Sequence, residues 1–205
     1  MRHLLAVFLV AAFGGAAAAQ SSNPMSYEAM SRAKKGSWAE YNMVVPGMAQ
    51  KMTVRYAVVE KTEHELTLET DSQTPMGPMH SSMTFAPLPP NEWQLVKGRV
   101  QMGTQPAQDV PTAQLGQGSV KKGDLVGKLV GPEKLTVPAG TFETKHYKRE
   151  LPKEAGGVTI DVWMSDKAVP TGVVKLSGGN GIEMVLSATG SGAKPKPETP
   201  APSKK

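Results

Sequence analysis

Cysteine is absent from this chain of 205 residues. Its absence excludes disulfide bonds, thiol catalysis and zinc–thiolate sites. It also excludes the lipid-attached type of export signal, which needs a cysteine at the cleavage point. We therefore expect the stability of the fold to come from its apolar core alone.

Catalytic signatures are missing as well. The chain has no Gly-Xaa-Ser-Xaa-Gly elbow, no His-Glu-Xaa-Xaa-His pair and no phosphate-binding loop. Of its four histidines, His64 abuts a turn, and His146 stands beside Lys145 and Lys148 without a second histidine or a carboxylate at ligand spacing. We therefore expect the protein not to be an enzyme.

The body of the chain also lacks a strong charge imbalance. The formal net charge is +5, but the last fifteen residues, 191–205, alone contain four lysines and one glutamate. The basic character therefore lies in this tail and predicts no nucleic-acid partner. Because the tail has no aliphatic side chains beyond alanine, we expect it to be disordered or extended. It would either solubilise the chain or make weak, salt-screened contacts with anionic envelope surfaces.

The first nineteen residues have the layout of a secretory signal peptide. Arg2 precedes an apolar run from Leu4 to Phe13, and small residues follow at 17–19. The run is too short to be a good membrane span. We therefore expect cleavage before Gln20 and a location in the periplasm or outside the cell, with residues 20–190 forming one domain.

Residues 135–190 are predicted to form an antiparallel meander. Turn signals at 138–140, 154–157 and 178–181 separate its strands. Between 158 and 165 the even positions are apolar, whereas the odd positions are polar apart from Trp163. This alternation predicts a sheet with one apolar and one solvated face, with a polar corner at 166–172 that bends it.

The preceding part of the chain extends this sheet. Asn23 and Pro24 can begin a short helix that ends near Gly36. The prolines at 74–83 and 85–91 predict interruptions, and residues 103–118 lack periodicity and predict a long loop. Strands are predicted at 38–45, 50–62, 65–71, 93–102 and 127–137.

A sheet with one apolar face must cover that face with a second sheet, a helix, its own curvature or a ligand. One short helix is too small to cover an apolar face that extends over so many strands. The sequence therefore predicts a mainly β fold: a single antiparallel, strongly curved sheet, or incomplete barrel, with a short N-terminal helix.

Three runs of sequence carry a family resemblance: residues 137–144, 161–166 and 169–175. Together they resemble bacterial periplasmic proteins of the DUF3108-like and outer-membrane lipoprotein carrier type. In those proteins an antiparallel sheet curls around a lipid-sized cavity that helices plug. The resemblance implies an incomplete barrel in the cell envelope, without assigning an activity.

The first functional hypothesis is a non-enzymatic envelope protein that binds an apolar ligand or a lipidated partner protein. The ligand would lie on the concave, apolar face of the sheet. The residues predicted to line it are Met43, Met52, Val54, Tyr56, Val158, Ile160, Val162, Met164 and Met184.

Copper binding is the second hypothesis, because the chain has twelve methionines. Met76, Met79, His80 and Met83 lie within eight residues, and thioethers with an imidazole suit copper(I). Methionine is equally an adaptable filler of irregular apolar cores, and in that case no cofactor is expected.

The third hypothesis is an envelope-assembly or structural interaction module. Its convex face or the long loop at 103–118 would then dock a partner protein. The sequence does not decide among these three hypotheses.

Overall fold

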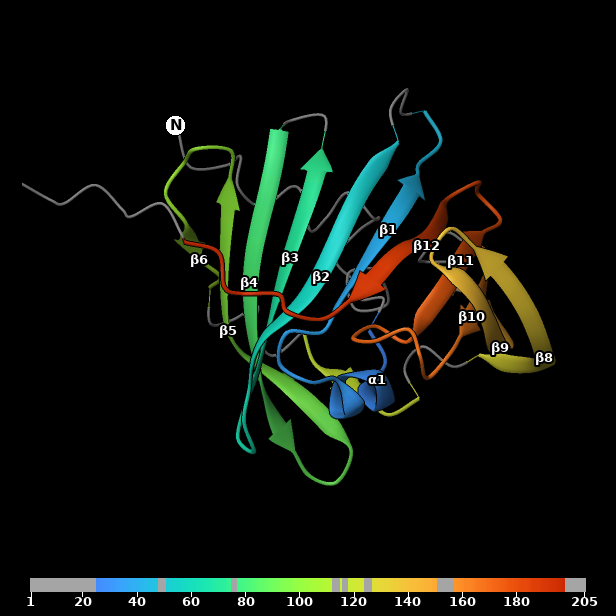
Figure 1. Ribbon diagram of the computed structural model, residues 1–205, viewed down its shortest axis with the longest axis horizontal. Coiled ribbons are helices and arrows are strands. Elements are labelled where there is room, and N and C mark those ends of the chain that lie inside the picture. The colour runs from blue at the N-terminus through green and yellow to red at the C-terminus, as the bar shows by residue number, and fades with distance from the viewer. Residues whose placement is uncertain are drawn as a thin grey trace, which may run out of the picture.

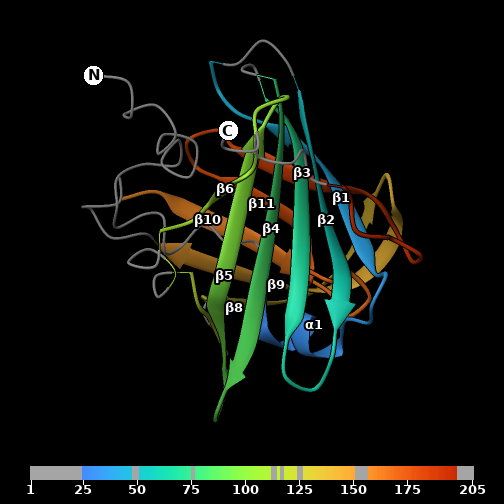
Figure 2. The same cartoon turned by 90° about the vertical axis from the view of Figure 1, so that its left-hand side faces the viewer.

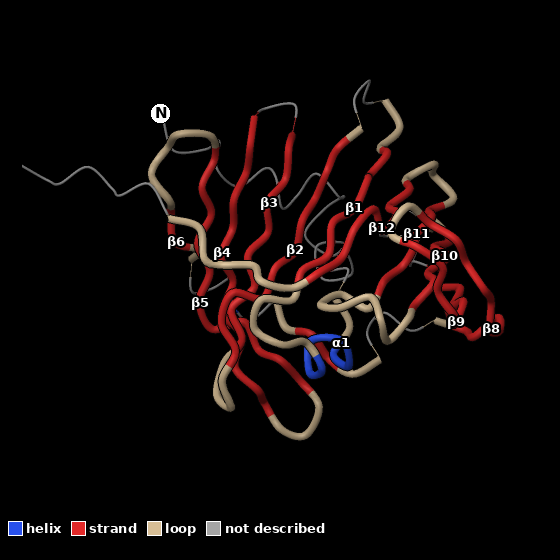
Figure 3. The backbone as a smooth tube through the Cα atoms, viewed as in Figure 1, coloured by secondary structure: helices blue, strands red, loops and turns tan. Residues whose placement is uncertain are grey.

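The computed structural model describes residues 25–47, 51–74, 77–111, 115, 118–123, 127–150 and 157–197. These residues form one antiparallel sheet of twelve strands and one helix (Figures 1 and 3). Its elements are α1 (Tyr27–Arg32), β1 (Trp38–Val44), β2 (Met52–Lys61), β3 (Leu66–Thr74), β4 (Gly77–Leu88), β5 (Glu92–Met102), β6 (Gln108–Asp109), β7 (Val120–Lys121), β8 (Lys128–Val137), β9 (Gly140–Glu150), β10 (Thr159–Met164), β11 (Val173–Gly178) and β12 (Glu183–Gly190).

The strand order is β6-β5-β4-β3-β2-β1-β12-β11-β10-β9-β8, and β7 pairs with β5. All pairs are antiparallel, and the first and last long strands, β1 and β12, meet near the centre of the sheet. The sheet is open, because β6 and β8 stand at opposite ends of this order. A mainly β fold with one antiparallel sheet and one short helix is thus confirmed. The strong curvature of an incomplete barrel stays a prediction.

Helix α1 begins about one turn later and ends about one turn earlier than the sequence predicts. Its N-cap is Ser26, whose hydroxyl accepts a hydrogen bond from the backbone N–H of Ala29 at 3.0 Å. At the other end the Lys61 ammonium donates to the carbonyls of Met30, Ser31 and Ala33, each at 2.8 Å. These three carbonyls lack partners within the helix, so Lys61 of β2 fixes where it ends. The predicted end near Gly36 is therefore wrong; Asn23 and Pro24 lie outside the described residues, and the helix begins only after Ser26.

The proline-containing stretch at 74–91 is more regular than expected. Strand β4 spans most of it, pairing with β3 over residues 77–85 and with β5 over residues 79–88. Pro78 lies next to the first residue of β4 and Pro87 next to the last, and both are exposed. Proline is tolerated at strand ends, where a missing N–H costs little. The predicted interruptions are therefore wrong for residues 77–88, whereas residues 89–91 form the predicted break as a turn between β4 and β5.

The corner at 166–172 connects two paired strands. β10 and β11 pair antiparallel, with Val162 opposite Leu176. The corner is thus the loop of a hairpin, and the three predicted turns miss this fourth connection between the strands β8 to β12. That this corner bends the sheet stays a prediction.

The predicted loop at 103–118 contributes to the core. Within its described residues, β6 pairs with β5, and the Val110 N–H donates to the Gly98 carbonyl at 2.8 Å. Leu115 and the following Val120 pack into the apolar cluster beneath α1. This segment therefore adds apolar side chains to the same cluster that α1 covers.

The core consists of two clusters. The helix-side core joins α1 to β2–β5 and contains Met25, Met30, Ala33, Val58, Leu66, Leu68, Phe85, Trp93, Leu95 and Val120. The meander core lies on β1, β2 and β8–β12, and its buried members include Tyr41, Val137, Phe142, Val173 and Leu186. Tyr56 packs against both. Helix α1 therefore covers the helix-side core and contributes no residue to the meander core.

The chain end crosses the sheet. Residues 191–197, called the C-terminal strap below, run from the end of β12 across β2, β3 and β4 (Figure 1). Figure 2 shows β8–β11 crossing behind β2–β5, on the side of the sheet away from the viewer. Among the described residues no helix is both long and apolar enough to cross a bilayer. The predicted signal peptide and the tail beyond residue 197 lie outside the described residues.

Candidate functional site

Eight of the nine residues predicted to line an apolar site meet in the meander core. Met43, Val54, Val162 and Met184 are among its buried members. Met52, Tyr56, Ile160 and Met164 are partly buried and pack against them. Val158 is partly exposed and lies outside the cluster. Alternation along each strand therefore placed side chains from four different strands on one apolar surface.

A row of direct cross-strand neighbours runs through this surface. Met52 lies opposite Met43, Met43 opposite Met184, Met184 opposite Leu176, and Leu176 opposite Val162. The row spans β2, β1, β12, β11 and β10 without a polar residue. Three of its five members are methionines, whose unbranched thioether side chains adapt to differently shaped apolar neighbours.

Two tyrosines border the row. The rings of Tyr41 and Tyr56 meet edge to face with centroids 5.9 Å apart. The Tyr41 hydroxyl contacts the Thr171 hydroxyl and donates to the Val173 carbonyl at 2.7 Å. Burial raises the pKa of both phenols well above the ordinary value of tyrosine. Both are therefore neutral and add apolar ring surface to the cluster.

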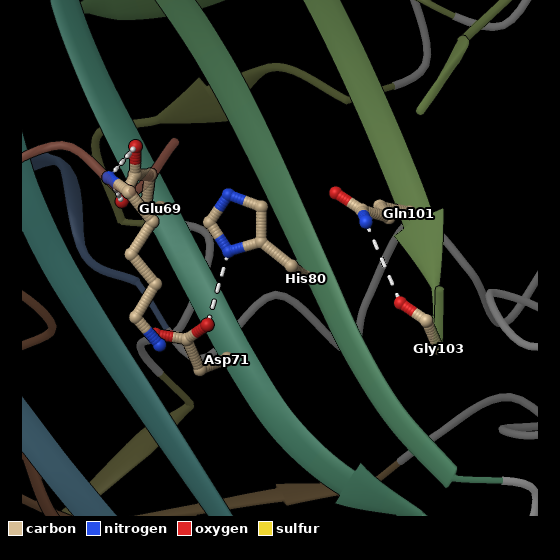
Figure 4. Close-up of polar contacts among 6 residues, drawn as sticks. Glu69, Asp71, His80, Gln101 and Gly103 are labelled. Carbon is tan, nitrogen blue, oxygen red and sulfur yellow. Dashed lines mark hydrogen bonds and ion pairs between the residues drawn. The ribbon is translucent and has the colours of Figure 1, made fainter. Parts of the chain in front are cut away.

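A second candidate site is polar and lies on β3 and β4 (Figure 4). Asp71 and His80 are direct cross-strand partners, and the His80 Nδ1 lies 3.0 Å from the Asp71 Oδ1. Glu69 precedes Asp71 by two residues and therefore shares its face of the sheet. Its side chain is buried. In Figure 4 the His80 ring stands between Asp71 and Gln101, which comes from β5.

The pKa values of the two carboxyl groups are shifted in opposite directions. Desolvation raises the pKa of Glu69, against the hydrogen bond that its carboxylate accepts from the Lys196 backbone. Desolvation also acts on Asp71, but hydrogen bonds from His80 and Lys196 outweigh it and lower the pKa of Asp71. The site thus holds one firmly ionised carboxylate beside one whose charge is penalised by burial.

A cavity of about 220 Å³ opens beside these groups. Its lining includes Asp71, His80, Gln101, Gly103, Lys196 and Pro197. The Nε2 atom of His80 is buried and has no hydrogen-bond partner among the described residues. The cavity therefore combines a carboxylate, an imidazole and an amide with the end of the C-terminal strap.

The residues predicted to bind copper are divided between the two faces of β4. Met79 and Met83 share one face, whereas His80 faces Asp71 on the other, because neighbouring residues of a strand point to opposite sides. Met76 lies outside the described residues. Within the described ranges no three histidine, aspartate or glutamate side chains are grouped so as to hold a metal ion.

A group of contacts around His146, which the sequence analysis does not predict, lies on the meander. The His146 Nε2 is 2.7 Å from the Asp161 Oδ1, and the His146 ring stacks on Trp163 with centroids 4.3 Å apart. The Trp163 indole N–H donates to the Glu133 Oε2 at 2.6 Å. The ammonium of Lys175 lies over the Trp163 ring, 5.6 Å from its centre. Because His146 and Lys175 cover this indole, it is not free to stack on a ligand.

Comparisons with known proteins do not identify a family. No family model matches the chain, and no curated protein matches its sequence. Among solved structures, the hypothetical protein CT021 from Chlamydia trachomatis is similar at 9% identity and a TM-score of 0.46, over 87% of this chain and 95% of that one. A predicted exported protein with a YmcC-like fold from Bacteroides fragilis is similar at 13% identity and a TM-score of 0.42, over 77% and 97%.

A third structure is that of a predicted lipoprotein from Parabacteroides distasonis. It has 14% identity and a TM-score of 0.39, over 77% of this chain and 96% of that one. Likeness at this level carries no function from one protein to another. The resemblance to DUF3108-like and lipoprotein carrier-like proteins stays a prediction.

Proposed function

We propose that the protein is an exported, non-enzymatic binding protein of the cell envelope. It holds an apolar ligand, or the acyl chain of a lipidated partner protein, against the meander core. The strongly curved form of the sheet belongs to this proposal, because curvature would give the ligand a concave surface. Export rests on the layout of residues 1–19, and the absence of catalytic activity on the missing sequence signatures.

The observation that carries the proposal is the methionine-rich row from Met52 to Val162. Its buried members, Met43, Val162 and Met184, fix one continuous apolar surface, whereas Met52 and Leu176 remain partly exposed. Helix α1 covers the helix-side core but contributes no residue to the meander core. Partly exposed apolar groups next to a buried cluster provide contact area for an apolar ligand, at roughly 25 cal/mol per Å² removed from water.

Adaptable side chains favour a flexible ligand. Methionine has three rotatable side-chain bonds and repacks easily, so it suits chains of variable length better than a rigid ring system. The ligand class supported best is therefore an acyl chain. The alternatives of copper binding and of an interaction module have no comparable set of converging residues among those described.

Fluorescent fatty-acid binding and native mass spectrometry test the proposal. The unsubstituted protein should bind the probe and retain lipid through gentle purification. Met52→Ser should weaken probe binding at least fivefold, because it places a hydroxyl at the partly exposed end of the row. Met102→Ser is the matched control, since Met102 also lies on a strand but belongs to neither core cluster. Absence of bound lipid together with absence of probe binding would refute the proposal.

A further inference from the structure

The C-terminal strap is bound to the sheet along its length. Near its start the Trp38 indole N–H donates to the Ser191 carbonyl at 3.3 Å. The Ala193 N–H then donates to the carbonyl of Gly36 at 3.0 Å. At Gly36 a Cβ atom would come within 3.0 Å of the Gly192 backbone nitrogen, so two glycines allow the two backbones to approach closely. These contacts direct the following residues toward β3.

Lys196 contacts β3 through both its backbone N–H and its side-chain ammonium. Its backbone N–H donates to both oxygens of the Glu69 carboxylate, at 3.2 and 3.3 Å. Its ammonium lies 2.8 Å from the Asp71 Oδ2. Since Glu69 and Asp71 are two residues apart on β3, their spacing matches the distance between a lysine backbone N–H and the end of its side chain.

The Asp71 carboxylate is shared between His80 and Lys196. His80 holds the other oxygen of Asp71 at 3.0 Å, which leaves Oδ2 free for the ammonium. Glu69 is only 6% exposed, and among the described residues its carboxylate accepts hydrogen bonds from Lys196 alone. With the strap in place Glu69 is a buried carboxylate, and such a group needs the N–H donor that Lys196 supplies.

The sequence of the strap suits an extended ligand. Lys194, Pro195, Lys196 and Pro197 repeat a Lys-Pro unit. A residue that precedes proline is held in an extended conformation, which lowers the entropy lost on docking. The cavity of about 220 Å³ continues from Lys196 toward Gln101 and Gly103, so the site is larger than the side chain that occupies it.

We infer that Glu69, Asp71 and His80 form a recognition site for a lysine in an extended, proline-flanked peptide segment, and that Lys196 of the same chain is its resident ligand. A lysine-bearing segment of the same kind from another chain competes for this site. Lys196 is thereby engaged by carboxylates, so it is not among the tail lysines available to an anionic surface.

A labelled, end-capped peptide of residues 191–197 tests the inference with full-length protein. Lys196→Ala weakens the strap and vacates the ammonium position, so this variant should bind the peptide at least tenfold more tightly than the unsubstituted chain. Lys194→Ala removes the same charge from an exposed neighbour and should bind the peptide no better than the unsubstituted chain. Adding Asp71→Asn to Lys196→Ala should weaken binding at least tenfold.

A second peptide probes recognition of the lysine without any change at Glu69, Asp71 or His80. The same segment with Lys196→Ala in the peptide should fail to bind the Lys196→Ala chain, which keeps the readout valid if the Asp71→Asn variant folds poorly. Hydrogen exchange of the Lys196 amide should be slow in the unsubstituted chain and at least tenfold faster in the Asp71→Asn variant. Equal binding of both peptides, or no binding of either, would overturn the inference.

Discussion

The hydroxyl of Tyr41 on β1 donates a 2.7 Å hydrogen bond to the carbonyl of Val173, the first residue of β11. These two strands do not pair with each other, because β12 lies between them. The same hydroxyl contacts Thr171 in the loop that precedes β11. One buried phenol therefore holds the β10–β11 loop against the centre of the sheet.

Tyr41→Phe should lower the free energy of unfolding by about 1–3 kcal/mol, because it leaves a buried carbonyl and a buried hydroxyl without this partner. Urea denaturation at pH 7 measures the loss. Tyr147→Phe is the control, since Tyr147 is partly exposed and should change stability by less than about 0.5 kcal/mol. Equal effects of the two substitutions would contradict this role of Tyr41.

The buried phenols predict a loss of stability in alkali. Burial raises the pKa of Tyr41 and Tyr56 in the folded state above the ordinary value of 10.0. Above pH 10 the unfolded chain releases these protons while the folded chain keeps them, so unfolding becomes more favourable as pH rises. Each phenol contributes a slope of up to about 1.4 kcal/mol per pH unit. Urea denaturation between pH 9 and 11 should show a shallower slope in Tyr56→Phe, and an unchanged slope would contradict the assignment.

Gly172 predicts a sensitive position in the same loop. Its φ is +86°, and a Cβ atom would lie 2.8 Å from the Ser26 Oγ and 3.0 Å from the Ala29 Cβ. Gly172→Ala should therefore both strain the backbone and push α1 away, lowering stability by about 2 kcal/mol or more. Gly103→Ala shares the positive φ, at +55°, but meets nothing within 4 Å. It should cost only about 1 kcal/mol in thermal denaturation, and a cost as large as that of Gly172→Ala would rule out the steric part of this explanation.

Neutralising Asp71 and neutralising Glu69 should change the stability of the fold in opposite directions. The pKa of Asp71 is lowered in the fold, so its charge stabilises the fold above the ordinary aspartate pKa, and this stability is lost as pH falls through the lowered value. The pKa of Glu69 is raised, so the fold gains stability below the ordinary glutamate pKa and loses it as pH rises through the raised value. At pH 7, Asp71→Asn should therefore destabilise by about 1 kcal/mol. Glu69→Gln should stabilise, and the difference should shrink at pH 3.

Denaturation of both variants at the two pH values is the check. Shifts of the same sign at pH 7 would show that the two carboxyl groups do not have these different environments.

The His146 cluster predicts a local contribution to stability. His146→Ala removes the contact with Asp161 and the stacking on Trp163, and should cost about 1–2 kcal/mol. His64→Ala, at an exposed turn, should leave stability unchanged. Tryptophan fluorescence during urea unfolding reports both. A negligible effect of His146→Ala would reduce this cluster to a surface contact.

Period-two alternation was sufficient to find most strands and the apolar surface. Met52, Val54 and Tyr56 share one side of β2 because the strand is regular, so their common face could be read from the sequence. Proline was the main source of error, because Pro78 and Pro87 were interpreted as breaks although both occupy strand ends.

The polar contacts between strands could not be predicted without knowing which residues lie opposite each other. His80 meets Asp71 because β3 and β4 pair in a register that places Thr74 opposite Gly77, and an irregular stretch at 74–83 predicts no such pair. His146 lies opposite Trp163 and diagonal to Asp161 because of the β9–β10 hairpin. The turn signal at 154–157 predicts this hairpin, but not which residues lie opposite each other. The strap contacts of Lys196 are separated from Glu69 and Asp71 by more than a hundred residues, and no local pattern predicts them.

The pairing of β1 with β12 also bears on how the chain folds. Trp38 lies opposite Gly190, so the ladder at the middle of the sheet joins segments from opposite ends of the domain. That ladder cannot form until nearly the whole chain has been synthesised, and closing so large a loop makes folding slow. A chain of this topology therefore lacks the central ladder of its sheet for most of its synthesis. A truncation that removes β12 would separate the two halves of the sheet, and neither half would retain its central partner.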